Sequence, residues 1–298
     1  MMTAHHTRLS VPAFFALLLM ANSATAQQSF PSPDAASAAL VDAARTREPA
    51  LLDRIFGPDA RGLLSTGDAT LDRERLDRFN QSAAESVSLT PRGDAVRVLA
   101  VGKRGFEFPI PIVRRGDIWM FDVAAGREEI INRTIGENEL RAIEACQAYI
   151  AAQREYIRMD HDGDQVLEFA QHLVSTPGKR DGLYWQRTGQ ADVSPLEGSL
   201  SEALLERENR TYAGYRFRIL MEQGPSAPGG AHSFLINGNM IAGFGLVALP
   251  AKWGKTGVMT FMCGHNGVVL QKNLGPKTAE IANRLLRYDP DNSWTLVE

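Results

Sequence analysis

The feature that most constrains the fold is an amphipathic stretch at residues 137–158, which strand-like runs follow. Leu140, Ile143 and Cys146 recur at the spacing of three and four residues that places side chains on one face of a helix. Ile150 continues the same stripe one turn further. Because a helix with one apolar face must bury that face against another layer, the sequence predicts a long helix packed on an antiparallel sheet.

Five runs after residue 214 are typical of strands of that one sheet. They are residues 215–221, 233–236, 240–248, 257–263 and 268–272. Asn237-Gly238 and Asn266-Gly267 predict hairpins, because both residue types tolerate the positive φ angles of tight turns. A helix at 278–286 is expected to close the chain.

The N-terminal half predicts helices first and then strands. Helices are expected at 33–47, 51–56 and 71–84, and strands at 86–89, 95–101 and 118–123. Ser32 and Pro33 suit the start of the first helix. Residues 106–113 are extended, but Pro109 and Pro111 predict an edge strand or an irregular segment, since proline cannot donate to a sheet. The pattern is that of a compact α+β unit.

Several shorter helices are expected around the long one. A joining helix is predicted at 128–133, and Thr134 with Glu137 has the spacing of a capping box that would begin the long helix. Further helices are predicted at 167–174 and 199–207.

Residues 1–26 have the features of a cleavable secretory signal. Arg8 precedes an apolar run at 11–20, and Ala24-Thr25-Ala26 provides a small-x-small cleavage site. The apolar run is too short for a permanent membrane-spanning helix, which needs about 20 residues. The sequence therefore predicts cleavage after Ala26, a periplasmic or secreted location and no integral membrane segment in the mature protein.

Removal of 26 residues from 298 leaves a chain longer than one typical domain. We expect two domains, at residues 27–130 and 131–298. The composition is that of a soluble globular protein, with 44% hydrophobic residues and a formal net charge of −3. Without a basic surplus to hold phosphates, nucleic acid is not an expected partner.

The two cysteines, Cys146 and Cys263, lie far apart in the sequence and form no CxxC pair. An oxidising compartment permits a disulfide between them. Two buried thiols are the alternative, because a cysteine packs as a small hydrophobe. Sequence separation leaves both alternatives open.

Three motifs identify the chain by resemblance. These motifs resemble an uncharacterised bacterial family, domain of unknown function 2950. They are Asp160-His161-Asp162-Gly163-Asp164, the run at 175–185 that ends in Tyr184-Trp185, and the loop at 223–230, together with residues 257–261. The resemblance covers nearly all of the chain after residue 26. It implies an exported protein, and it brings no catalytic residues.

A weaker resemblance concerns the two halves separately. Residues from about 29 to 125 are similar to the cone-shaped α+β domains of the nuclear-transport-factor-2-like (NTF2-like) group. Residues from about 137 onward resemble the globular part of a type IV pilin or pseudopilin. Pilins begin with a membrane-spanning helix, and another domain takes that place here, so the resemblance does not imply filament assembly. A fold alone does not assign a function.

The acidic loop is the candidate metal site. Asp160, Asp162 and Asp164 alternate, and Glu168 follows four residues later. Hard cations such as Ca²⁺ prefer several oxygen ligands from a tight loop that contains glycine. In such a loop these residues would occupy the first, third, fifth and ninth positions, with the Val166 carbonyl at the seventh. The glycine and the final bidentate glutamate of the usual pattern are displaced or missing, and a solvated turn is the alternative.

A candidate recognition surface lies shortly after the acidic loop. It combines cationic, acidic and aromatic side chains: Lys179, Arg180, Asp181, Tyr184 and Trp185. Aromatic rings provide contact area at low entropic cost in binding surfaces. A structured loop held by its aromatic residues is the alternative.

The sequence contains no nucleophile elbow, no HExxH motif and no phosphate-binding loop. We therefore expect a non-catalytic binding or envelope-associated protein, whose partner is an unknown protein or small molecule of the cell envelope. A periplasmic hydrolase of unrecognised type is the alternative. A buried cluster of Asp181 with His172 or His232 in a pocket would favour the hydrolase.

Overall fold

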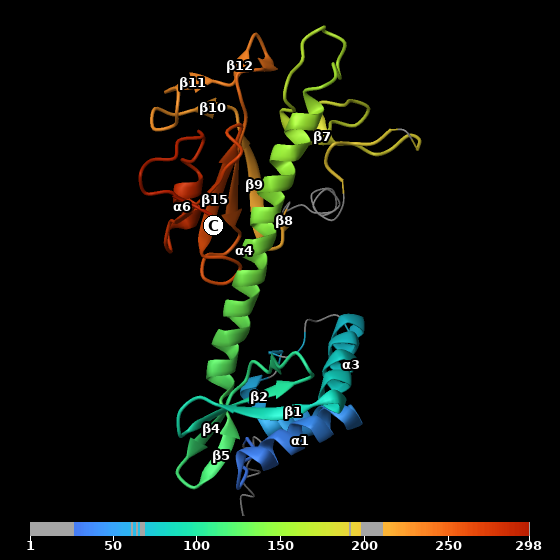
Figure 1. The fold of residues 1–298 in the computed structure, drawn as a ribbon, viewed down its shortest axis with the longest axis vertical. Coiled ribbons are helices and arrows are strands. Elements are labelled where there is room, and N and C mark those ends of the chain that lie inside the picture. The colour runs from blue at the N-terminus through green and yellow to red at the C-terminus, as the bar shows by residue number, and fades with distance from the viewer. Residues whose placement is uncertain are drawn as a thin grey trace, which may run out of the picture. The chain divides into compact units, whose positions relative to one another are not determined.

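The computed structural model describes residues 27–60, 62–63, 65, 69–190, 192–197 and 211–297. The chain divides into two compact units, one that ends at Arg127 and one from Glu128 onward (Figure 1). The fold is α+β, with antiparallel sheets and one long helix, as the sequence predicts. The expected signal at 1–26 and the expected helix at 199–207 lie outside the described residues.

Three helices and a short 3-10 turn begin the first unit. They are α1 (Pro33–Thr46), α2 (Pro49–Phe56), η1 (Pro58–Ala60) and α3 (Ala69–Glu85). The Ser32 hydroxyl accepts a hydrogen bond from the Ala35 N–H at 3.1 Å and thereby caps α1. Arg47 ends α1 in the left-handed conformation, with φ of 58°. All three predicted helices are present, within two residues of the expected ends.

The sheet of the first unit is antiparallel, with the strand order β1-β2-β4-β5 and β3 paired to β2. The strands are β1 (Val87–Pro91), β2 (Val96–Val101), β3 (Phe106–Glu107), β4 (Ile112–Arg115) and β5 (Ile118–Phe121). The expected extended run at 106–113 is split, and Pro109 and Pro111 lie in the break between β3 and β4. The expectation of an edge position was wrong for Ile112 and Val113, because β4 lies between β2 and β5. Both prolines stay outside the paired strands, so no ladder hydrogen bond is lost.

The core of the first unit lies between its helices and its sheet. Phe56, Phe108 and Phe121 form successive ring contacts, with centroids 5.0–6.4 Å apart. Ile110 and Ile112 are fully buried beside these rings. Burial of this apolar surface is the main source of stability for such a unit.

One continuous helix, α4 (Val123–Tyr156), replaces the two helices predicted at 128–133 and 137–158. The helix begins where the Asp122 carboxylate accepts a hydrogen bond from the Ala125 N–H at 3.0 Å. The capping box at Thr134 and Glu137 was a wrong prediction. The Thr134 hydroxyl donates to the carbonyl of Ile130, one turn earlier in the same helix, and so does not act as a cap.

The second unit contains a six-stranded antiparallel sheet with the order β17-β16-β15-β14-β9-β8. Its strands are β8 (Thr211–Tyr212), β9 (Tyr215–Leu220), β14 (Gly245–Pro250), β15 (Met259–Gly264), β16 (Val269–Asn273) and β17 (Thr295–Leu296). The runs predicted at 215–221, 257–263 and 268–272 are therefore strands of one sheet. The run predicted at 240–248 joins the sheet only from Gly245.

Two short ribbons lie outside this sheet, so the prediction that all five runs share one sheet was wrong. They pair β10 (Glu222–Gln223) with β11 (His232–Ser233), and β12 (Leu235–Ile236) with β13 (Asn239–Met240). Asn237 and Gly238 have φ of 55° and 96°, so the predicted Asn-Gly hairpin is confirmed between β12 and β13. Gly243, with φ of 138°, separates β13 from β14 and interrupts the predicted run.

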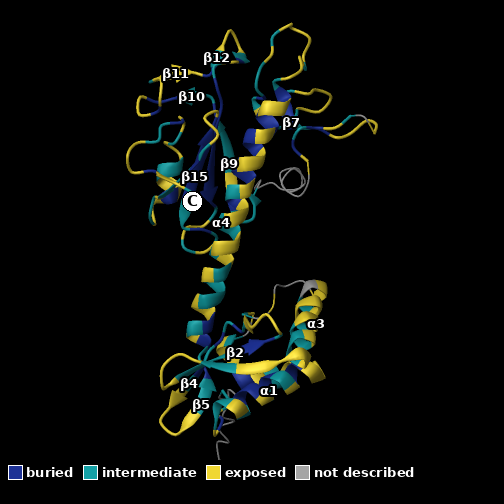
Figure 2. Cartoon of the chain, viewed as in Figure 1, coloured by how far each residue is buried: buried dark blue, intermediate teal, exposed yellow. Residues whose placement is uncertain are grey.

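Helix α4 covers one face of the six-stranded sheet, while α6 (Thr278–Ala282) lies on the other side (Figure 1). Cys146, Tyr149 and Ile150 are buried against the sheet, as predicted for this helix face. Leu140, which we expected on the same face, is 64% exposed. In Figure 2 the buried residues concentrate on the strands and on the side of α4 that meets them.

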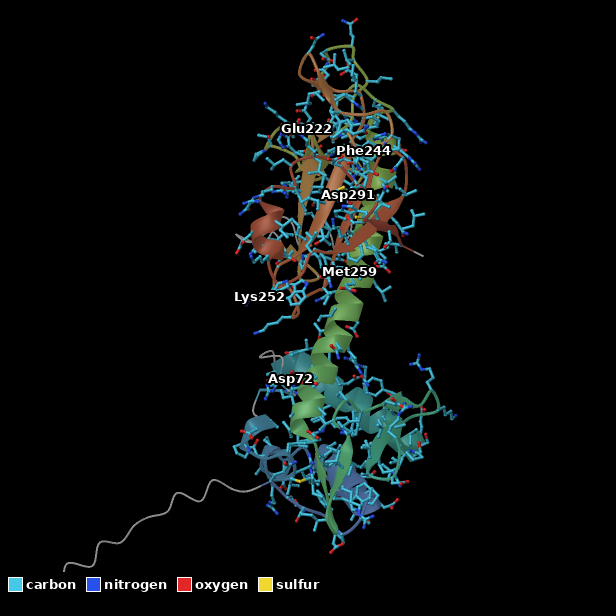
Figure 3. The ribbon with its side chains drawn as sticks, turned by 90° about the vertical axis from the view of Figure 1, so that its left-hand side faces the viewer. Asp72, Glu222, Phe244, Lys252, Met259 and Asp291 are labelled. Atoms are coloured by element: carbon cyan, nitrogen blue, oxygen red, sulfur yellow. The ribbon has the colours of Figure 1, made fainter. Side chains whose placement is uncertain are left out.

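Polar contacts fix the position of α4 on the sheet. The Glu139 carboxylate accepts hydrogen bonds from the backbone N–H groups of Val258 and Met259, at 2.8 and 2.9 Å. The Tyr149 hydroxyl donates to the Gly245 carbonyl at 3.1 Å, and its ring meets that of Phe244 edge-on. Figure 3 labels Met259 and Phe244, which lie at different heights along the helix. The helix is therefore held at two points along its length.

The helix predicted at 167–174 is absent, and that prediction was wrong. Residues 172–174 form β6 (His172–Val174), which pairs in parallel with β7 (Gly182–Tyr184). The buried side chain of Gln153 binds both backbone groups of Ala170, accepting from its N–H and donating to its carbonyl, each at 2.8 Å. These bonds take the place of the bonds that a helix would make within itself. The closing helix is also shorter than predicted, since α6 ends at Ala282.

Within the described residues, no helix has both the length and the apolar character needed to cross a membrane.

Candidate calcium-binding loop

The acidic loop follows the C-terminal end of α4, which positions it. Tyr156 is the last helical residue, and the chain then turns tightly through Arg158 and Met159. Gly163 and Gln165 have positive φ angles of 84° and 70°, which bend the loop back on itself. Glycine adopts this conformation without the steric cost that a side chain brings.

The loop brings together the three aspartates that the sequence singles out. Asp160, Asp162 and Asp164 each present a carboxylate oxygen, and these three oxygens lie within 4.8 Å of one another. All three side chains are exposed. Three unit charges at this separation repel one another unless a cation or protons intervene.

Backbone N–H groups of the loop hold the Asp160 carboxylate. One of its oxygens accepts from Gly163 at 2.7 Å and from Asp162 at 3.3 Å, and the other accepts from Gln165 at 2.9 Å. These bonds lower the pKa of Asp160 below its ordinary value of 3.8, and the bond from Gln165 has the largest effect. Asp160 is therefore ionised at neutral pH. A carboxylate oxygen that accepts one such bond keeps a second lone pair for a cation.

The other two aspartates are held in a similar way. Asp162 accepts from the Asp164 N–H at 3.3 Å, and Asp164 accepts from the Val166 N–H at 2.8 Å. The second oxygen of Asp164 accepts from the Asn239 side-chain amide at 2.6 Å. Asn239 belongs to β13, so this bond ties the acidic loop to the hairpin of β12 and β13.

Glu168, the fourth predicted ligand, lies outside the cluster of three oxygens. Its Oε2 accepts from the Met240 N–H at 3.0 Å and from the Gln171 amide at 3.4 Å. Gln171 also donates to the Gly238 carbonyl at 2.7 Å. Glu168 therefore anchors the chain to the same hairpin, and the cluster supplies three of the six to eight oxygens that Ca²⁺ takes. Backbone carbonyls and water would supply the others.

His161 is not one of the clustered ligands and packs against aromatic rings. Its ring stacks on Tyr156 with centroids 4.1 Å apart and lies 5.6 Å from the ring of Trp185. Burial lowers the pKa of His161 below its ordinary value, although the hydrogen bond with the Tyr156 carbonyl opposes this. The neutral ring packs the base of the loop against the segment at 179–185.

In that segment the aromatic residues of the candidate recognition surface are packed inward. Trp185 is 8% exposed and Tyr184 is half-buried, whereas Lys179 and Arg180 are exposed. The Trp185 indole N–H donates to Asp192 at 2.9 Å, and Arg180 forms an ion pair with the same carboxylate at 2.7 Å. The Trp185 ring thus offers little area to a partner.

Asp181 lies near His172, which pairs with the adjacent Gly182, but His232 is not part of this group. Partial burial acts to raise the pKa of Asp181, but hydrogen bonds from the Thr176 N–H and hydroxyl outweigh it and lower the pKa, with a smaller contribution from His172. Each Asp181 oxygen is therefore engaged by Thr176. His232 contacts the Gly230 carbonyl instead.

Sequence reasoning missed the residues that fix the loop from a distance. Asn239 and Gln171 lie 75 and 67 positions from the groups they bind, and Gln153 reaches Ala170 from the interior of α4. The Asn-Gly hairpin signal locates the turn beside Asn239. Nothing in the sequence indicates which segment this turn meets.

The comparisons with known proteins place the chain in a family. A search of curated proteins found no match, and neither did a search of solved structures. The model of a family described as "Protein of unknown function (DUF2950)" matches residues 27–297. This match covers almost the whole of the chain, which therefore belongs to the DUF2950 family.

Proposed function

We propose that this is an exported protein of the cell envelope that works by binding rather than by catalysis, and that it holds Ca²⁺ in the acidic loop. The observation that carries the proposal is the convergence of Asp160, Asp162 and Asp164 on one small volume. Hard, flexible oxygen ligands of this kind suit Ca²⁺. The signal-like features of residues 1–26 support export to a compartment where Ca²⁺ is abundant.

The ion would act on structure. Asp164 is bonded to Asn239, and Glu168 to Met240, so the middle and the C-terminal end of the loop contact the hairpin of β12 and β13. Neutralising the three carboxylates would remove their mutual repulsion and favour the folded loop. The loop, the hairpin and the end of α4 would then be stabilised together.

A cavity on the second unit supports binding. Leu173 and Val174 of β6 face Phe217 and Ile219 of β9 across a cavity of about 230 Å³. His172 is the one ionisable side chain among the described residues that line it. Five apolar side chains and two polar ones, Gln171 and His172, line this cavity.

A second cavity of about 330 Å³ lies beside the first, and Ile219 and Met221 line both. Its charged residues already have partners. Glu222 is paired with Arg287 at 3.0 Å, and Arg218 donates to the Ala282 carbonyl at 2.6 Å. The two cavities therefore suit an apolar segment of a protein or small molecule of the envelope.

The hydrolase alternative has less support. Asp181 would have to exchange protons with a substrate, but both of its oxygens accept hydrogen bonds from Thr176 and its pKa is lowered. A general acid or base near neutral pH needs a raised carboxyl pKa. The Asp181 side chain instead stabilises the turn between β6 and β7.

Thermal unfolding in EDTA and in millimolar CaCl₂ tests the proposal. Ca²⁺ bound only to the folded state should stabilise it by about 2.7 kcal/mol at a hundredfold excess over Kd, and so raise the Tm. The double variant Asp162→Asn/Asp164→Asn should lose this increase. Asp117→Asn, an exposed aspartate of the first unit, should keep it. Equal Tm values for the wild type in both buffers would refute the calcium site.

A further inference from the structure

The two cysteines of the chain meet in the core of the second unit. Cys146 lies on α4 and Cys263 on β15, separated by 117 positions in the sequence. Both are completely buried. The Sγ of Cys263 lies 3.8 Å from the carbonyl oxygen of Cys146, so the sulfur of one residue reaches the backbone of the other. In this structure they are separate thiols.

The rest of the helix-sheet contact holds the two residues in register. Tyr149, one turn after Cys146, donates to Gly245, and Gly245 is the register partner of Gly264, the neighbour of Cys263. Glu139 binds the beginning of β15 through Met259. Contacts on both sides of the pair therefore hold α4 against β15, whether the two sulfur atoms are thiols or form a disulfide.

We propose that Cys146 and Cys263 are joined by a disulfide in the exported protein. The proposal rests on the export proposed above, because disulfides persist in oxidising compartments and are rare in the cytosol. The chain contains no other cysteine, so no competing pairing exists within it. The bond would tie the middle of α4 to the centre of the sheet.

The reaction is a thiol–disulfide exchange with a disulfide oxidant, either a small molecule or a protein. The thiolate of one cysteine attacks a sulfur of the oxidant, forms a mixed disulfide and releases one oxidant thiolate. The second cysteine then attacks the chain's own sulfur in the mixed disulfide and releases the other. One S–S bond forms in the chain, one breaks in the oxidant, and two electrons pass to the oxidant. The two thiol protons pass to solvent or to the released thiolates.

The buried position sets the order of events. Burial raises the pKa of the Cys263 thiol well above its ordinary value, and the neighbouring Cys146 adds a smaller effect in the same direction. Because the thiolate is the reacting form, exchange in the closed core is slow. The bond must therefore form while α4 and the sheet are still separable, and once formed it is shielded from reductant.

Thiol labelling of the full-length protein, produced with its N-terminal segment and recovered from the periplasm of a bacterial host, tests the proposal. The protein is denatured and treated with a maleimide before and after reduction. We expect no labelled cysteine before reduction and two after it. Proteolysis without reduction should yield one linked pair of peptides that contain Cys146 and Cys263. Two labelled cysteines before reduction would overturn the proposal.

A second experiment tests the pairing of the cysteines independently of export. The same protein, reduced and unfolded, is refolded in a glutathione redox buffer, where the two cysteines should again pair. If pairing occurs there but the cell retains the chain in its cytoplasm, export fails and the pairing stands. If the exported protein and the refolded protein both keep two thiols, the pairing is wrong. The variant Cys146→Ala/Cys263→Ala shows the labelling background, and its Tm should not respond to reductant. The Tm of the wild type should fall, because reductant reaches the bond as the chain unfolds.

Discussion

Asp192 shows how a single carboxylate holds an irregular segment in place. Its oxygens accept hydrogen bonds from the Thr188 hydroxyl and N–H, from the Trp185 indole and from Arg180. The bonds from Thr188 and then Trp185 lower the pKa of Asp192 from 3.8 to about 2. The side chain is only 11% exposed. Its charged form is therefore stabilised by the fold.

This lowered pKa gives a prediction for acid stability. The folded state binds the Asp192 proton less tightly than the unfolded state, so its contribution is complete above pH 3.8 and is lost as the pH falls to about 2. Asp192→Asn should lower the Tm at pH 7. Between pH 3.8 and about 2, the Tm of this variant should depend less steeply on pH than the Tm of the wild type. Asp94→Asn, an exposed aspartate of the first unit, should keep the wild-type slope. Parallel wild-type and Asp192→Asn curves would exclude this role for the carboxylate.

The sequence pattern predicts part of the structure of the acidic loop. The alternation of Asp160, Asp162 and Asp164 predicted their convergence, because alternate residues in a tight loop turn to one side. The spacing also placed Glu168 beside them, but Glu168 binds the Met240 N–H instead. That choice depends on a backbone group 72 positions away, which no local pattern reveals.

Among the elements, α4 departs most from what its sequence predicts. The capping spacing of Thr134 and Glu137, which encloses Gly136, indicates a break, but the helix is continuous. A glycine costs a helix interior about 0.5–1 kcal/mol, and neighbouring helical residues and tertiary contacts outweigh this. The local signals at residues 134–137 therefore predicted a helix end at a point where continuing the helix is lower in free energy than ending it.

Two glycines of α4 make the continuity testable. At Gly136 an added Cβ would meet nothing within 4 Å, so Gly136→Ala should stabilise the protein by about 0.4–1 kcal/mol. At Gly126 an added Cβ would lie 2.5 Å from the Ile110 side chain. Gly126→Ala should therefore destabilise by about 1–3 kcal/mol through overpacking. Urea unfolding of the two variants should show opposite shifts, and destabilisation by Gly136→Ala would indicate that residue 136 is not in a helix.

The opposite error occurred at 167–174, where the sequence suggests a helix and the structure has an irregular segment followed by β6. The deciding contact is that of Gln153 with Ala170, which fixes the backbone just before β6 begins. Gln153 is completely buried. A polar residue on an otherwise apolar helix face is the signal that sequence reading could have used, since a buried amide needs partners.

At the scale of the whole molecule, the α+β class and the long helix on an antiparallel sheet were predictable from periodicity. The split of the C-terminal strands into one sheet and two ribbons was not, because strand pairing depends on contacts distant in sequence. The family match over residues 27–297 begins at the residue that follows the expected cleavage point. The NTF2-like and pilin-like comparisons stay expectations.

Export gives a prediction for the chain as a whole. We expect the mature protein to begin at Gln27, because Ala24-Thr25-Ala26 provides a small-x-small cleavage site. Intact-mass measurement of protein from the native host checks this. Ala24→Arg/Ala26→Arg should block cleavage and leave a heavier chain. A wild-type protein that retains Met1 would contradict the prediction.

The buried tyrosines of the second unit give it an optical signal of its own. All six tyrosines of the chain fall between residues 149 and 288, and none lies in the first unit. Burial holds the pKa of Tyr149, Tyr215 and Tyr288 above the ordinary value of 10.0, and each hydroxyl has a hydrogen-bond partner. In alkaline solution these phenols ionise only when the fold opens, which lowers its stability. The phenolate absorbance that appears only as the fold opens therefore comes from the second unit, without any introduced label.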